Sequence, residues 1–291
     1  MSGIYAAIVT PFTADEALDE DRLASHIEFV LDNGIAGVVP IGGCGEYVNL
    51  LPHERQRVVE LTVQIVGGRV PVIAGALAPS TREAIDIGCA AARLGANALL
   101  VLPPYYIRPS NAGIVGHFRD VAQATGLPVI VYNNPPRTGM AIGVDLLAEL
   151  ADVPGIVAVK DCDRDLASIT SKVERLGERL SILGGDDDLV YHVLLSGGDG
   201  AIMANANLAP RMCVDLYQAC VRRDVRSALA LNRKMLPLIQ VRQGPNHPGP
   251  LKDLMAMAGR PVGPARRPLR GMTDQQRQQA DTLLSRLGEI H

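Results

Sequence analysis

The chain has 291 residues, of which 47% are hydrophobic and 20% charged, enough for one large domain or two small ones. Its formal net charge is −3 and its acids and bases are interspersed, which argues against nucleic-acid binding and a basic membrane-binding patch. No apolar run approaches the roughly 18 residues that cross a bilayer, and the first residues lack the features of a signal peptide, so we expect a cytoplasmic protein.

The potential metal-binding and redox residues are scattered. The five cysteines are odd in number and never spaced as Cys-x-x-Cys, which argues against a disulfide framework or a zinc site and favours a reducing compartment. The six histidines form no His-x-x-x-His pair, so we expect no metal.

Short aliphatic segments alternate with amphipathic segments along the chain. The predicted strands are 4–11, 35–41, 70–74, 96–102, 128–132, the segment from Gly155 that ends in Lys160, 180–183 and 200–203. The predicted helices between and after them are 19–33, 52–67, 80–94, 111–125, 144–150, 166–176, 189–195 and about 208–222.

Eight strand–helix units with short connections predict parallel pairing and a closed (β/α)8 barrel, the TIM barrel, over residues 1–223. The alternative is a doubly wound sheet. Gly43-Cys44-Gly45 begins a Gly-x-Gly pattern but lacks the third glycine, and no segment matches a phosphate-binding P-loop. Residues 224–291 are expected to form a helical segment packed on the barrel, with helices at 225–241, 251–258 and 274–287.

Lys160 ends an apolar run that suits a strand buried on both faces. The chain has only four lysines, and burial disfavours the charged form of a lysine, which can then attack carbonyl groups as a neutral amine. The alternative is that Lys160 reaches out to solvent or pairs with Asp161.

In a barrel of this kind the active site lies at the C-terminal ends of the strands. The polar or glycine-rich residues that follow the predicted strands are Thr10, the loop from Gly42 to Glu46, Tyr105, Tyr106, the segment from Tyr132 to Arg137, Lys160, the segment from Gly184 to Asp188, Asn205 and Asn207. A neutral lysine forms a Schiff base with a 2-oxo acid, a tyrosine can relay protons, and glycine-rich loops and arginine bind carboxylates.

Several of these residues also have purely structural interpretations. The glycine-rich loop could be a tight turn, the two tyrosines a lid or an oligomer contact, and Arg137 a surface residue. The acidic run Asp186-Asp187-Asp188 could begin a helix. Cys44 is expected to be a packed thiol because no histidine partner is apparent near it.

The chain resembles the dihydrodipicolinate synthase and N-acetylneuraminate lyase family of Schiff-base aldolases over nearly its whole length. The segments that carry the resemblance are Ala7-Ile8-Val9-Thr10-Pro11-Phe12, the Gly42 to Glu46 loop, Pro71-Val72-Ile73-Ala74-Gly75, Pro104-Tyr105-Tyr106, Tyr132-Asn133-Asn134-Pro135, Arg137-Thr138-Gly139, Val159-Lys160 and Gly184-Gly185-Asp186-Asp187. The resemblance implies a TIM barrel with a C-terminal helical segment, a homotetramer of two tight dimers, and no cofactor besides the covalent lysine Schiff base.

Residue by residue, the resemblance implies that Lys160 is the Schiff-base lysine and Tyr132 the adjacent proton shuttle. Tyr106 matches the tyrosine that crosses the tight-dimer interface in the synthase, and Arg137 matches the arginine that binds the second substrate's carboxylate. Gly185 and Ile202 match residues whose backbone lines the pyruvate pocket.

One loop departs from the family pattern. Gly43 and Cys44 stand where the family usually has two hydroxyl residues, and the first of these links the two tyrosines in the synthase's proton relay. Backbone N–H groups of Gly43 and Cys44 can still bind a carboxylate, and a water in the space left at Gly43 could complete the relay.

Three functional hypotheses follow. The first is a Schiff-base lyase that takes pyruvate or another 2-oxo acid and makes or breaks a C–C bond with an aldehyde, or dehydrates a 2-keto-3-deoxy acid. The second is an authentic 4-hydroxy-tetrahydrodipicolinate synthase that condenses pyruvate with aspartate semialdehyde. The third is a non-catalytic barrel that binds a 2-oxo acid.

Overall fold

The structure is a computed structural model that describes residues 1–287. Its centre is one sheet of eight parallel strands in the order β2-β1-β8-β7-β6-β5-β4-β3. The strands are β1 (Gly3–Ala6), β2 (Gly37–Val38), β3 (Ile73–Ala76), β4 (Ala98–Val101), β5 (Val129–Asn133), β6 (Ile156–Asp161), β7 (Ser181–Gly184) and β8 (Gly200–Met203). A parallel bridge between Val38 and Val72 joins the two ends of the sheet, so the strands form the predicted TIM barrel.

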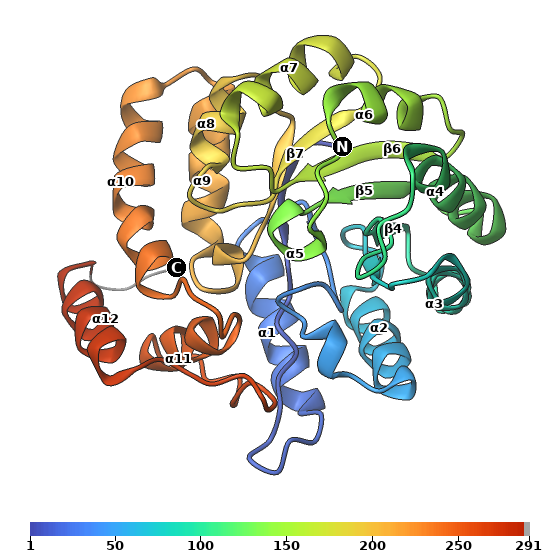
Figure 1. Cartoon of the computed structure of the whole chain (residues 1–291). Helices are drawn as coiled ribbons and strands as arrows, with labels where there is room; N and C mark the ends of the chain where they lie inside the picture. Colours follow the sequence, from blue (N-terminus) through green and yellow to red (C-terminus); the bar gives the residue numbers. More distant parts are fainter. Residues whose placement is uncertain (288–291) are drawn as a thin grey trace.

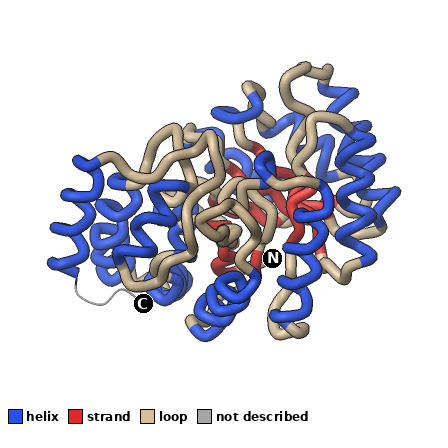
Figure 2. Tube along the Cα trace, turned by 90° about the horizontal axis from the view of Figure 1, so that it is seen from below, coloured by secondary structure: helices blue, strands red, loops and turns tan. Residues whose placement is uncertain are grey.

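Helices surround this barrel, as Figures 1 and 2 show from two directions. They are α1 (Glu20–Asp32), α2 (Pro52–Val66), α3 (Thr81–Arg93), α4 (Asn111–Thr125), α5 (Pro135–Thr138), α6 (Val144–Ala151), α7 (Leu166–Leu176), α8 (Val190–Leu195), α9 (Pro210–Val221), α10 (Val225–Val241), α11 (Gly249–Met257) and α12 (Asp274–Leu287), with short 3₁₀ helices at Tyr47–Asn49 and Asn205–Asn207. Within residues 1–287, none of these helices has the length and apolar character needed to span a membrane.

The helix ends follow local sequence signals. Asp19, the residue before α1, accepts a hydrogen bond from the Arg22 backbone N–H, and Ser80 does the same for Glu83 at the start of α3. Gly67 and Gly126 end α2 and α4 in the left-handed conformation that glycine adopts without steric cost. Such local signals explain why the predicted helices agree with the observed ones to within two residues.

The predicted strands differ from the observed ones at their ends: the predictions 4–11, 35–41 and 96–102 were too long, 70–74 was displaced by two to three residues, and the other four agree to within one residue. Regular pairing of β1 stops at Ala6, although Ala7 and Ile8 still donate single backbone hydrogen bonds to Met203 and Val39. The prediction also missed α5, a single turn of four residues. So short a helix produces no hydrophobic periodicity.

The last three helices lie together on one side of the barrel, where Figure 1 shows them in orange and red. Helix α10 packs against α8, α9 and α12, and α12 also contacts α11. The division between a barrel at 1–223 and a helical segment at 224–291 stays a prediction.

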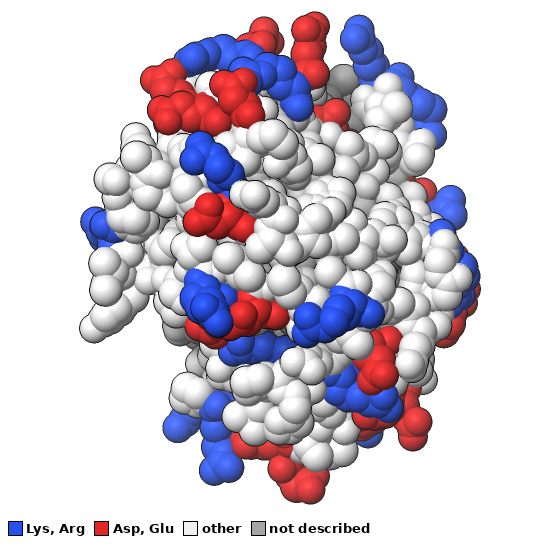
Figure 3. All heavy atoms as spheres, turned by 90° about the vertical axis from the view of Figure 1, so that its right-hand side faces the viewer, with Lys and Arg blue, Asp and Glu red and all other residues white. Residues whose placement is uncertain are grey.

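Two apolar layers form the core. One fills the barrel interior and includes Tyr5, Ala158 and Ile202; the other, which includes Val159, lies between the strands and the helices. Because the interior is filled with side chains, a ligand can bind only at an end of the barrel. On the face shown in Figure 3, acidic and basic side chains are intermixed around an uncharged area.

Candidate active site

A cavity of about 580 Å³ opens at the C-terminal ends of the strands. Its lining includes Gly43, Cys44, Tyr132, Arg137, Lys160 and Gly185, six of the eight residues predicted for the site. These residues come from the ends of β5 and β6, from the loops that follow β2 and β7, and from α5, so the barrel brings together residues that lie more than 140 positions apart.

Lys160 occupies the inner face of β6. It shares this face with Ala158 and Cys162, because side chains alternate along a strand, whereas Val159 faces the helices. The register of β5 and β6 pairs Lys160 with Tyr132, and the Lys160 Nζ lies 4.4 Å from the centroid of the Tyr132 ring. The side chain is buried, with 6% of the residue exposed.

The surroundings of Lys160 act on its pKa in opposite directions. Burial disfavours the ammonium form, whereas Tyr132, Cys162 and Cys44 favour it when they are ionised, and the balance raises the pKa of Lys160. Burial also raises the pKa of Tyr132 to about 12 and that of Cys44 to about 11, so these neighbours hold their own protons at neutral pH. With these neighbours neutral, burial is the effect that acts on Lys160 near neutral pH, and it favours the neutral amine; that this amine attacks a carbonyl group stays a prediction.

Tyr132 carries the hydroxyl next to this amine. Asn134 donates a hydrogen bond from its Nδ2 to the Tyr132 hydroxyl over 2.8 Å, which holds the phenol in place beside Lys160. A protonated, oriented phenol can donate a proton to a reacting oxygen or carbon and take it back.

Gly185 leaves the room that the lysine needs. A Cβ atom at this position would overlap the Cys162 sulfur and lie 3.1 Å from the Lys160 Cε. Any side chain here would displace the lysine or the thiol, which explains a glycine at the end of β7.

The loop after β2 contributes Gly43 and Cys44. Gly43 is exposed, and a Cβ there would meet no atom within 4 Å, so the space of the missing hydroxyl side chain is open. Cys44 is buried, and its sulfur lies 3.3 Å from the His247 Nε2. The expectation that Cys44 has no histidine nearby was wrong, because the partner lies 203 residues away in sequence.

Two predicted site residues are not brought to the cavity. Tyr106 is 94% exposed and has a φ angle of 74°, whereas the neighbouring Tyr105 lines the cavity and its hydroxyl accepts a hydrogen bond from Tyr47 over 3.3 Å. Ile202 is fully buried in the barrel interior and is not part of the cavity lining.

The acidic run after β7 serves the cavity wall. Asp187 forms a buried ion pair with Arg242 and accepts hydrogen bonds from the backbone of Ala204 and Asn205. Helix α8 begins only at Val190, so these acids precede the helix instead of forming its first turn.

The residues predicted for the site did not include Cys162, Arg242 or His247. Cys162 had a usable signal, since it is two residues from Lys160 and must share its face of the strand. The other two lie between α10 and α11, and the rule that searches the strand ends does not reach that segment.

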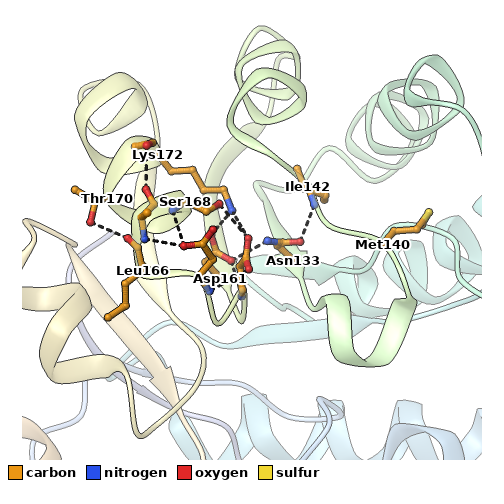
Figure 4. A network of polar contacts seen from close by, with 12 residues as sticks. Asn133, Met140, Ile142, Asp161, Leu166, Ser168, Thr170 and Lys172 are labelled. Atoms are coloured by element: carbon orange, nitrogen blue, oxygen red, sulfur yellow. Dashed lines mark hydrogen bonds and ion pairs between the residues drawn. The ribbon is translucent and has the colours of Figure 1, made fainter.

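The outer face of β6 carries a separate polar network (Figure 4). The Lys172 Nζ on α7 lies 2.7 Å from Asp161 Oδ2 and 3.5 Å from Asp163 Oδ2, and Asn133 donates to Asp161 Oδ1 over 2.8 Å. The Asn133 side chain also accepts from the Ile142 backbone N–H, so the network joins β5, β6 and α7. Asp161 therefore pairs with Lys172, and the alternative in which it pairs with Lys160 was wrong.

No group of three or more His, Cys, Asp or Glu side chains within residues 1–287 has the arrangement of a metal site. The side chains that line the cavity supply an amine, phenols, thiols, an imidazole, guanidinium groups and carboxylates.

Residues 1–287 match the family model described as "Dihydrodipicolinate synthetase family". The chain is 36% identical over 289 residues to a 4-hydroxy-tetrahydrodipicolinate synthase of Methanothrix thermoacetophila, a match that covers 99% of this chain and 97% of that protein. The crystal structure of the dihydrodipicolinate synthase of Aquifex aeolicus has a TM-score of 0.95 at 33% identity and covers 100% of this chain and 99% of that one.

A chloride-inhibited dihydrodipicolinate synthase of Acinetobacter baumannii, solved in complex with pyruvate, also has a TM-score of 0.95, at 32% identity and 99% coverage of both chains. The matches extend over the whole barrel and the C-terminal helices. The chain therefore belongs to the dihydrodipicolinate synthetase family, and it is a lyase of the Schiff-base aldolase type.

Proposed function

We propose that Lys160 is the nucleophile of this lyase and that its substrate is pyruvate or a related 2-oxo acid. The observation that carries the proposal is the position of Lys160: its amine lies in the cavity over the Tyr132 ring. No carboxylate of residues 1–287 lies within ion-pair distance of it. A buried lysine with a phenol partner and no counter-ion suits proton transfer better than structural support.

The reaction begins when Lys160 loses its proton and its amine adds to the C2 carbonyl of the 2-oxo acid. With uptake of one proton, the carbinolamine loses water and leaves a protonated imine. The imine withdraws electrons from C3, so that a C–C bond at C3 can form or break, or water can leave a 2-keto-3-deoxy acid. Tyr132 moves the protons, and the covalent imine replaces any other cofactor.

The remaining cavity residues bind the carboxylates. The backbone at Gly43 and Cys44 offers N–H groups to the carboxylate of the 2-oxo acid, and Gly185 bounds the space beside it. Arg137 on α5 is exposed at the cavity wall and can bind a second carboxylate through two parallel hydrogen bonds.

The second substrate separates two candidate functions. The names of the relatives favour condensation of pyruvate with aspartate semialdehyde, and the pyruvate complex of the Acinetobacter protein supports the first substrate. Gly43 opposes the synthase, because it removes a hydroxyl from the proton relay. We therefore propose as the first candidate an aldolase whose other substrate is an aldehyde, or a dehydratase of a 2-keto-3-deoxy acid.

Assembly is part of the same proposal. Tyr106 is 94% exposed and the neighbouring Ile107 is 75% exposed. A second copy of the chain would cover these two apolar side chains in the homotetramer that the family resemblance implies. We propose that Tyr106 then reaches the cavity of the neighbouring copy and acts there in catalysis.

The experiment that tests the nucleophile uses pyruvate, sodium borohydride and intact mass measurement, with Lys160→Ala as the comparison. A reduced pyruvate adduct on the wild type that is absent from the variant is the expected result. A folded wild type without an adduct would overturn the proposal.

Turnover then decides the substrate class. Pyruvate release from 3-deoxy-2-oxo acids, or their dehydration, supports the first candidate. Condensation with aspartate semialdehyde at a rate equal to or above these reactions would move the assignment to the synthase. Binding of pyruvate without turnover of any of these compounds would contradict both.

A further inference from the structure

The cavity contains a second pair of reactive side chains whose function the proposed chemistry does not assign. Cys44 comes from the loop after β2 and His247 from the segment between α10 and α11, and the Cys44 sulfur lies 3.3 Å from the His247 Nε2. Both residues line the cavity that contains Lys160. The pair therefore joins the barrel to the C-terminal segment inside the site.

The segment that carries His247 is fixed at both ends. Arg242, just after α10, forms the buried ion pair with Asp187. On the other side, the Gly249 backbone N–H donates to the Asn246 carbonyl over 2.7 Å, and a side chain at Gly249 would overlap the backbone of Arg270. His247 is thus held against Cys44 by surrounding structure and not by their contact alone.

The pair is uncharged at neutral pH. Burial, together with the positive charges of Arg242, Arg137 and Lys160, lowers the pKa of His247 to about 3. Burial raises the pKa of the Cys44 thiol to about 11 despite the opposing effect of Lys160. Both shifts favour the neutral forms, so the pair differs from the thiolate–imidazolium pair of cysteine nucleophiles, and its 3.3 Å contact is a hydrogen bond between neutral groups.

A neutral imidazole that uses one nitrogen toward a thiol has one nitrogen left. If the thiol donates to Nε2, Nδ1 carries a proton and donates; if Nε2 donates to the sulfur, Nδ1 accepts. Within the described residues the His247 ring makes no hydrogen bond besides the one to Cys44. A hydroxyl group both donates and accepts, so it complements either tautomer, whereas a carbonyl oxygen complements only one.

We propose that Cys44 and His247 form a hydroxyl-recognition pair, which hydrogen-bonds the oxygen on C4 of a 2-oxo acid bound at Lys160. The enzyme then prefers 4-hydroxylated 2-oxo acids to the same acids without this hydroxyl. The inference rests on the proposed function, because it requires a Schiff base at Lys160. It assigns His247 as a specificity-determining residue and Cys44 as the residue that orients its ring.

The test uses two acids that differ only in the C4 hydroxyl, 4-hydroxy-2-oxobutanoate and 2-oxobutanoate. For each acid, the imine at Lys160 is trapped with borohydride over a range of acid concentrations, and the modified fraction is measured by intact mass. If the bound hydroxy acid is cleaved before trapping, the resulting pyruvate adduct is added to the adduct of the whole acid. The readout is the ratio of the two half-saturation concentrations. A general loss of order in the cavity weakens the binding of both acids to a similar extent and leaves this ratio unchanged.

We expect the wild type to favour the hydroxylated acid by roughly ten-fold, the size of one hydrogen bond made in a buried site. His247→Phe retains a ring but no nitrogen and brings the ratio close to one. Cys44→Ala lowers the ratio and Cys44→Ser preserves it, because serine can still contact Nε2. The exposed His192 on α8 supplies the control, and His192→Phe keeps the wild-type ratio.

The outcomes separate the two levels of the proposal. No adduct with either acid overturns the lysine mechanism itself. Adducts with equal half-saturation on the wild type, or an unchanged ratio in His247→Phe, overturn the recognition pair and leave the mechanism standing. A ratio that steps between pH 5.5 and 8 would also contradict the pair, since His247 stays neutral over this range.

Discussion

The two faces of β6 hold two buried lysines in opposite circumstances. On the inner face Lys160 contacts a tyrosine ring in an open cavity. On the outer face the Lys172 amine from α7 lies 2.7 Å from Asp161, and both side chains are fully buried. Adjacent positions of one strand, 160 and 161, therefore hold the proposed nucleophile and a member of a buried ion pair respectively.

A third buried lysine resembles the outer one. The Lys252 Nζ lies 2.6 Å from Glu46 Oε1 and donates to the backbone carbonyls of Thr10 and Pro264. Buried charge is tolerated where a counter-ion and hydrogen bonds satisfy it. The comparison teaches that burial does not reveal what a lysine does, whereas its partners do. The same substitution at each face should then have different effects.

The largest effect is expected at the inner face. Lys160→Met retains the volume of the side chain but has no amine, so we expect no borohydride adduct and a loss of lyase activity of roughly 10⁴-fold or more. The urea midpoint should stay at or above the wild-type value, because no carboxylate loses a partner. Residual activity above one hundredth of wild type would show that another group acts as nucleophile.

The same substitution at the outer face should reduce stability and leave the chemistry at Lys160 intact. Lys172→Met leaves the Asp161 carboxylate buried without its cation, which is expected to cost about 3–5 kcal/mol of unfolding free energy in a urea titration. The protein that remains folded at low temperature should still form the adduct at Lys160.

The double variant Asp161→Asn with Lys172→Met removes both charges and should recover part of the lost stability. A Lys172→Met protein as stable as the wild type would mean that the Asp161–Lys172 pair contributes little, and the contrast between the two faces would fail.

Sequence alone predicted the inner face better than the outer one. Lys160 and Tyr132 end aliphatic runs, and the barrel rule places strand ends at the active site, so both could be found by counting strands. Nothing in the order of residues pairs Asp161 with Lys172, because that contact depends on how α7 packs on the sheet. Contacts from outside the eight repeats, such as His247 with Cys44, were missed for the same reason.

A smaller effect is expected from a substitution that reduces the space around the Lys160 side chain. Gly185→Ala places a methyl group against the Cys162 sulfur and 3.1 Å from the Lys160 Cε. Overpacking of about 1–3 kcal/mol should slow adduct formation by roughly ten- to one hundred-fold. Trapping rates at fixed pyruvate concentration measure it.

The double variant Gly185→Ala with Cys162→Ala removes the nearest clash and should regain part of the rate. A slower rate in the double variant than in Gly185→Ala would show that the methyl group acts by another route than its contact with Cys162.

The smallest effect is expected at His117, a buried histidine whose two hydrogen-bond partners are uncharged. His117 on α4 donates from Nε2 to the Leu102 carbonyl over 3.1 Å, so Nδ1 is left to accept from the Thr81 hydroxyl. Burial lowers the pKa of His117 to about 4, against about 6.5 in the unfolded chain. Its contribution to stability is complete above pH 6.5 and is lost as the pH falls toward 4, because the unfolded state takes up the proton first.

His117→Gln keeps a neutral side chain that does not titrate. Between pH 6 and 4.5 its unfolding free energy should therefore fall less steeply than that of the wild type, by up to about 1.4 kcal/mol per pH unit. Urea titrations at four pH values measure the two slopes. Equal slopes would show that His117 is protonated in the folded protein too, and its environment would then resemble that of the paired lysines instead of contrasting with it.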